Sequence, residues 1–136
     1  MADKGKAMNK FKCLLYSLTL LFCVSSCSRS HSIHIENIAS IKVAYVSETN
    51  QVEEKLYSDG SAELAFLKLW LKNNAEGWHP FVGTQPIASI YISGNEFWLN
   101  INRNSAILGY KSGEKEYTEL VKGVSYSDFN VLKTKP

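Results

Sequence analysis

The sequence predicts a small α+β domain, in which one main helix packs on an antiparallel β-meander of about four to six strands. The second half of the chain contains four short runs rich in strand-forming residues, separated by turns that contain Gly or Asn. Before them, residues 61–74 are rich in Ala, Leu, Glu and Lys and contain no β-branched residue, which favours a helix. A helix on one face of an antiparallel sheet buries the apolar surfaces of both.

Two strands are expected before this helix. Residues 35–46 are rich in β-branched residues and predict a first strand, although the spacing of Ile38, Ile41 and Tyr45 also fits a helical stripe. Residues 52–57 predict a short second strand, which ends before an Asp-Gly turn.

The helix itself is predicted from the spacing of its leucines. Leu64, Leu67 and Leu71 recur at helical spacing, and Lys68 and Lys72 mark a narrow polar stripe beside them. A hairpin strand is the rival interpretation, because the central leucines also alternate with other residues and an Asp-Gly turn precedes the segment. The composition favours the helix over the strand.

The meander follows in the second half of the chain. Phe97, Leu99 and Ile101 alternate with Trp98 and Asn100, so the two sets point to opposite faces of a strand. The first set is expected to pack on the helix. The expected elements are strands at residues 87–93, 96–102, 105–111 and 116–122, and a short helix within residues 124–132.

Residues 1–26 have the organisation of a secretory signal peptide. Four lysines precede a 12-residue apolar run at residues 13–24, and the chain turns polar directly afterwards. A helix of this length spans roughly 18 Å, well short of a hydrocarbon core of about 30 Å. The run therefore fits the core of a signal peptide better than a membrane span. A buried helix of a cytosolic protein is the alternative, which the lysines disfavour.

The end of this segment, Val24-Ser25-Ser26-Cys27, resembles the lipobox of bacterial lipoproteins. The resemblance implies that the chain is cut before Cys27, that a diacylglycerol is attached to the thiol, and that the new amino group is acylated. Two or three acyl chains anchor a protein stably, whereas one does so only marginally. Ser28 replaces the Asp that often retains such proteins in an inner membrane, which implies the outer membrane and a domain facing the periplasm. Cleavage as an ordinary signal peptide, without lipidation of Cys27, is the alternative interpretation.

Removal of the signal peptide changes the composition of the protein. The remaining chain has 11 basic and 12 acidic residues, so it lacks the basic character of a nucleic-acid-binding protein. Cys13 and Cys23 leave with the signal peptide, and no disulfide is expected. We expect residues 27–34 to be the lipidated cysteine and a tether, and residues 35–136 to form a single domain.

The sequence contains no recognisable signature of an enzyme, a cofactor site or a metal centre. No G-x-S-x-G, H-E-x-x-H, P-loop or dinucleotide-binding pattern occurs. His31 and His34 have a spacing that could bind a metal on a helix, but they lie in a polar stretch without a third nearby ligand. Glu53 and Glu54 are interpreted as solvated charges. The protein is therefore predicted not to be an enzyme, and to need no cofactor and no metal.

Binding to another protein is the remaining class of function, and Trp78, His79 and Phe81 are its first candidates. Two aromatic side chains, an imidazole and a proline directly after a helix could form a recognition surface. The alternative is a structural loop whose aromatic side chains close the end of the core. The structural alternative is favoured.

A second group of binding candidates comes from the meander. Trp98, Asn100 and Tyr110, together with Tyr91 and Tyr117, could place side chains on an accessible face or rim of the sheet. Aromatic residues are also ordinary strand residues. The sequence favours neither the binding interpretation nor the structural one.

The chain after the lipobox resembles small immunity lipoproteins that protect bacteria against secreted toxins, such as those of type VI secretion. The resemblance rests on WLKNN at residues 70–74, GW-x-P at 77–80 and YISGNEFWLN at 91–100. It implies a protein anchored to the bacterial membrane through Cys27 that binds a toxin and occludes it. Two alternatives are an inhibitor of a host hydrolase such as lysozyme, and an assembly or structural lipoprotein of an envelope complex.

Overall fold

The computed structural model describes residues 30–111 and 116–133. The predicted signal peptide, Cys27 and the turn expected at residues 112–114 lie outside the described residues.

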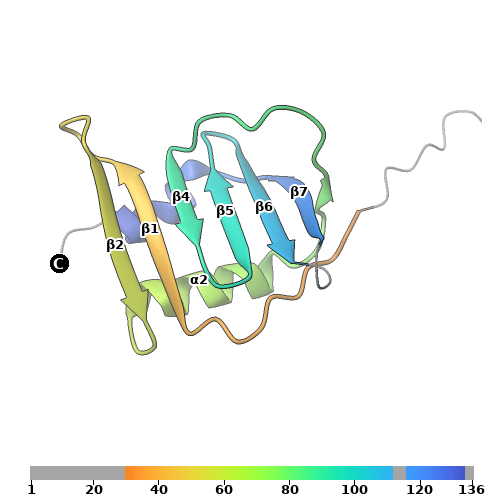
Figure 1. Cartoon of the computed structure of the whole chain (residues 1–136), viewed down its shortest axis with the longest axis horizontal. Coiled ribbons are helices and arrows are strands. Elements are labelled where there is room, and N and C mark those ends of the chain that lie inside the picture. Colours follow the sequence, from red (N-terminus) through yellow and green to blue (C-terminus); the bar gives the residue numbers. More distant parts are fainter. Residues whose placement is uncertain (1–29, 112–115, 134–136) are drawn as a thin grey trace, which may run out of the picture.

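The described chain forms one antiparallel sheet of seven strands with two helices on the same face (Figure 1). The strand order across the sheet is β2-β1-β4-β5-β6-β7-β3. The strands are β1 (Ser40–Val46), β2 (Val52–Ser58), β3 (His79–Pro80), β4 (Ile90–Ser93), β5 (Phe97–Ile101), β6 (Ser105–Lys111) and β7 (Tyr117–Gly123). The helices are α2 (Ala62–Asn73) and the 3-10 helix η1 (Tyr126–Lys133).

The predicted fold class, one main helix on four to six strands, is wrong. The sheet has seven strands, and strands account for 41% of the described residues against 20% in two short helices. The additional strand is β3, whose two residues include a proline. It pairs with β7 through long-range contacts, so no local run of strand-forming residues marks it in the sequence.

The meander from β4 to β7 is confirmed, because each of these strands pairs antiparallel with the next. The connection before it is more complex than a meander. After β2 at one edge of the sheet, α2 crosses the sheet to β3 at the opposite edge, and a loop at residues 81–89 returns to β4 (Figure 1). One face of the sheet is therefore crossed by a helix that connects the strands at its two edges.

The segment at residues 61–74 is a helix, and the rival hairpin strand is wrong. The Ser61 hydroxyl accepts a hydrogen bond from the Leu64 amide at 3.3 Å and caps the first turn. Leu64, Leu67, Trp70 and Leu71 are buried against the sheet. The buried positions repeat every three or four residues, as one face of an α-helix requires.

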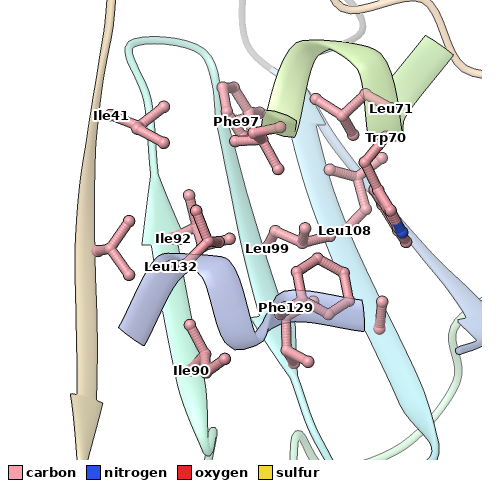
Figure 2. Close-up of a cluster of buried hydrophobic side chains, with 14 of the residues drawn as sticks. Ile41, Trp70, Leu71, Ile90, Ile92, Phe97, Leu99, Leu108, Phe129 and Leu132 are labelled. Carbon is pink, nitrogen blue, oxygen red and sulfur yellow. The ribbon is translucent and has the colours of Figure 1, made fainter. Parts of the chain in front are cut away.

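The core lies between the sheet and the two helices (Figure 2). Phe129 and Leu132 of η1 are fully buried, and the Phe129 ring lies 4.8 Å from that of Trp70 in α2. Phe97, Leu99 and Ile101 of β5 face these helices, as predicted. The core thus unites both helices with the central strands.

The folded domain begins earlier in the chain than the sequence predicts. His31 pairs with Trp78, the Ile33 amide donates to the Ala75 carbonyl at 2.8 Å, and Ile33 is buried. The predicted tether at residues 27–34 is therefore too long. The first strand begins at Ser40 instead of residue 35, because Asn37 has a positive φ of 58°, which interrupts an extended strand.

Candidate functional site

The candidate site lies on the outer face of the sheet, opposite the two helices. Tyr91 in β4 and Trp98 in β5 point to this face, because their strand neighbours Ile90, Ile92 and Leu99 are buried on the other. Tyr91 and Trp98 are diagonal neighbours across the two strands. Their rings are 6.4 Å apart between centroids and inclined by only 20°. The two rings are therefore nearly parallel and stack against each other, which makes one apolar surface.

Gly109 in β6 fixes the position of the indole. It lies directly opposite Trp98 in the register, and a Cβ atom at Gly109 would come within 2.1 Å of the Trp98 Cε2 atom. The indole thus lies flat over the backbone of β6, a place that only a glycine leaves open. Trp98 is half-buried as a result, and Tyr91 is 40% exposed.

Lys42 in β1 bounds this surface on the side toward β2. It lies opposite Ser93, and its Nζ atom forms an ion pair with Glu54 of β2 at 2.7 Å. Both side chains are about half exposed, so this pair contributes little to stability. We call the surface formed by Tyr91, Trp98, Gly109, Lys42 and Ser93 the aromatic patch.

Part of the outer face over β5 and β7 is covered by the loop at residues 81–89. Asn100 donates from Nδ2 to the Pro86 carbonyl at 3.0 Å and accepts from Asn102 at its Oδ1 atom. Gln85 donates to the Glu119 carboxylate at 3.1 Å. Asn100 is only 4% exposed. The prediction that Asn100 contacts a partner is therefore wrong, because its polar groups hold the loop.

Trp78 is likewise structural, and its assignment as a binding residue is wrong. It is fully buried, its Nε1 atom donates to the Asn74 carbonyl at 2.7 Å, and its ring packs edge-on against Trp70 at 6.4 Å. The alternative interpretation, a loop that closes the end of the core, describes its position.

His79 and Phe81 lie at the β3 edge, apart from the aromatic patch. His79 is exposed in β3, and the half-buried Phe81 donates its amide to the Glu119 carbonyl at 3.0 Å. Three strand steps separate β3 from β5 in the sheet, which corresponds to about 14 Å. These two residues and Trp98 do not share one site.

Tyr110 is also separate from the patch. It lies opposite Phe97 in the register and packs against the core on the helix side of the sheet. There it lines an open hollow of about 440 Å³ with Asn37 and Phe97. Of the residues predicted for binding on the meander, Trp98 and Tyr91 lie together on the outer face with accessible side chains, whereas Asn100 and Tyr110 do not.

The sequence did contain a signal for the patch that the prediction overlooked. Gly109 stands between Leu108 and Tyr110 inside a strand, and a glycine inside a strand often marks a close approach. Lys42 carries no comparable signal, because its place beside Ser93 depends on the pairing of β1 with β4.

One further polar contact lies at the helix-side face of β2. The Tyr45 hydroxyl donates to the Glu53 carboxylate at 2.8 Å. This hydrogen bond, together with burial and the negative charge, raises the pKa of Tyr45 to about 12. The contact ties β1 to β2 through their side chains as well as through the backbone.

Within residues 30–111 and 116–133, no group of three or more His, Cys, Asp or Glu side chains is placed to hold a metal ion. In the same ranges, neither helix has the length and apolar character needed to cross a bilayer.

Comparison of the chain with protein family models, with curated proteins and with solved structures gave no match. The site must therefore be interpreted from its own geometry.

Proposed function

We propose that this protein is a lipid-anchored immunity protein of the bacterial envelope, which binds a toxin delivered into the periplasm and occludes it. The observation that carries the proposal is the aromatic patch. Trp and Tyr are the residues that most often dominate the energy of protein interfaces. Trp98 lies over Gly109 and stacks with Tyr91, so binding would cost little additional side-chain entropy.

The scaffold supports an occluding role. The described residues contain no cysteine, and the domain is stabilised by one continuous core that includes both helices and the central strands. A rigid sheet presents the patch without a change of shape on binding, which is the usual behaviour of inhibitory complexes.

The proposed lipid on Cys27 would hold the domain close to the membrane by one edge. His31 pairs with Trp78 beside β3, and three residues lie between Cys27 and His31. Such a stretch spans at most about 14 Å. The anchor would therefore place the domain where it can meet a protein that enters the periplasm.

The test is survival of a strain that lacks this protein in competition with sister cells that secrete toxins. Wild-type protein is expected to restore survival, whereas Trp98→Ala and Tyr91→Ala reduce it at equal protein levels. Leu69→Ala is the control, because Leu69 is an exposed apolar residue, 57% accessible, on α2 at the opposite face of the sheet. This control is expected to protect as well as the wild type.

Three results would contradict the proposal, each in a different way. Full protection by Trp98→Ala would show that the aromatic patch is not the binding site. Sensitivity of the deletion strain to lysozyme, but not to sister cells, would indicate an inhibitor of a host hydrolase. A defect of the envelope without either sensitivity would indicate an assembly lipoprotein.

A further inference from the structure

The outer edge of β2 is the longest backbone edge that the described sheet leaves without a neighbouring strand. β2 has seven residues and pairs on one side with β1, whereas the other edge strand, β3, has two residues. An edge of this length presents backbone donors and acceptors that can pair with another strand.

The pairing of β1 with β2 determines which groups point outward. The Ser47 amide donates to the Gln51 carbonyl at 2.8 Å, and the Asp59 amide donates to the Ala39 carbonyl at 3.1 Å. In an antiparallel ladder, hydrogen-bonded pairs alternate with pairs that are not hydrogen-bonded. The odd-numbered residues of β2 therefore bond to β1. The backbone groups of the even-numbered residues, Val52, Glu54, Leu56 and Ser58, point away from it.

We propose that β2 pairs antiparallel with β2 of a second copy of this chain, with Glu54 of one copy opposite Glu54 of the other. The two sheets then form one continuous sheet across a two-fold axis. In this register the even-numbered residues form the new hydrogen-bonded pairs, as their outward backbone groups require.

The side chains of β2 are complementary to themselves in this register. On the outer face, Val52 of one copy lies opposite Leu56 of the other, and these two residues are 69% and 75% exposed in the single chain. On the helix-side face, Glu53 of one copy lies opposite Lys55 of the other, and the same pair forms twice. Apolar and oppositely charged cross-strand pairs both stabilise a sheet.

The like charges at the centre are already compensated. Glu54 forms an ion pair with Lys42 of its own chain at 2.7 Å, so two carboxylates and two ammonium groups meet at the axis. Tyr45 holds the other two charged residues in place, because its hydroxyl binds Glu53 and Lys55 lies 5.9 Å from the centre of its ring.

The neighbouring registers are less favourable. A centre at Lys55 places that lysine opposite itself, and a centre at Glu53 does the same with that carboxylate. A centre at Leu56 separates Glu53 from Lys55 and places Glu53 opposite Asp59. Like charges directly opposite each other destabilise a sheet, so the register centred on Glu54 is the one that the sequence of β2 fits.

The test is disulfide cross-linking of the full-length protein in the oxidising envelope. In Glu54→Cys the two cysteines lie opposite each other with Cα atoms about 5.5 Å apart, which is within the range of a disulfide. A cross-linked species of twice the chain mass is expected, well above the wild-type background. Ser58→Cys is the matched control on the same edge, since its two copies lie about 26 Å apart in this register.

Charge reversal tests the register in the Glu54→Cys background. Lys55→Glu places two carboxylates opposite each other and is expected to lower the cross-linked fraction several-fold. The added substitution Glu53→Lys restores the opposite charges and is expected to restore the fraction. Circular dichroism of each variant shows whether the fold persists.

Four results would overturn the proposal: no cross-linked dimer of Glu54→Cys, equal cross-linking of Ser58→Cys, a cross-linked product with a different protein, or no recovery in the folded double charge variant. The dimer is independent of the proposed immunity function. Trp98→Ala is expected to leave cross-linking unchanged even where it abolishes protection.

Discussion

Replacement of Trp78 by alanine is expected to destabilise the fold strongly, whereas the same change at Trp98 is not. Trp78 is fully buried, donates a hydrogen bond to the Asn74 carbonyl and packs against Trp70. Removal of a buried tryptophan costs about 3–5 kcal/mol. This is a large part of the total stability of a domain of this size, about 5–15 kcal/mol.

Urea denaturation of the chain from residue 28 onward, followed by circular dichroism, measures both effects. With a denaturant slope of ~2 kcal/mol per molar, a loss of ~4 kcal/mol lowers the midpoint by ~2 M. Trp98 lies on the outer face and is half-buried, so Trp98→Ala is expected to cost about 1 kcal/mol or less. The same variant should weaken binding of a partner by more than about 1 kcal/mol.

The comparison of the two variants can refute the assignment of faces. A Trp98→Ala midpoint as low as that of Trp78→Ala would place Trp98 in the core. A Trp78→Ala midpoint equal to that of the wild type would show that Trp78 does not close the core.

Three further predictions follow from individual contacts. Gly109→Val is expected to displace the Trp98 indole, because even a Cβ atom would lie 2.1 Å from it; protection should fall as in Trp98→Ala, and a crystal structure or NMR shifts of the indole would show the displacement. Asn100→Ala removes the hydrogen bond that holds the loop at residues 81–89, so we expect a loss of about 1–3 kcal/mol and faster proteolysis within the loop, measured by urea denaturation and limited digestion. The hydrogen bond from the Tyr45 hydroxyl to Glu53 raises the pKa of Tyr45 from 10.0 to about 12. The folded state therefore holds the hydroxyl proton more tightly than the unfolded chain does. The resulting stabilisation is present below pH 10 and is lost as the pH rises through 12. The difference in urea midpoint between wild type and Tyr45→Phe should therefore shrink between pH 9 and pH 12, and a constant difference would contradict this assignment.

Local patterns were sufficient to predict most elements of the fold. The strand at Ser105–Lys111 was predicted with its observed bounds, and the other strands of the meander differ by one to three residues at their ends. The helix Ala62–Asn73 was predicted from composition and spacing. These signals are local, because side-chain direction in a helix or strand repeats with a short period.

The fold class and the site depended on contacts between distant residues. The Pro-containing β3 exists only because β7 lies beside it, and Trp78 is buried because α2 and residue 31 enclose it. The burial of Asn100 also depends on a distant segment. Its alternation with buried residues correctly predicted that it lies on the outer face, but the loop that covers it there belongs to another part of the sequence. Exposure therefore could not be inferred from the strand pattern alone.

The sequence by itself determined the helix, the meander and the two faces of its strands, since hydrophobic periodicity within a segment is sufficient for each. It is also the sole basis for the proposed signal peptide and lipid anchor, which lie outside the described residues. The tertiary structure decided which aromatic side chains are accessible, because burial depends on what packs over a residue. It separated Trp98 from Trp78, placed Gly109 beneath the indole, and left β2 at an edge. The candidate site is thus a property of strand order and covering loops.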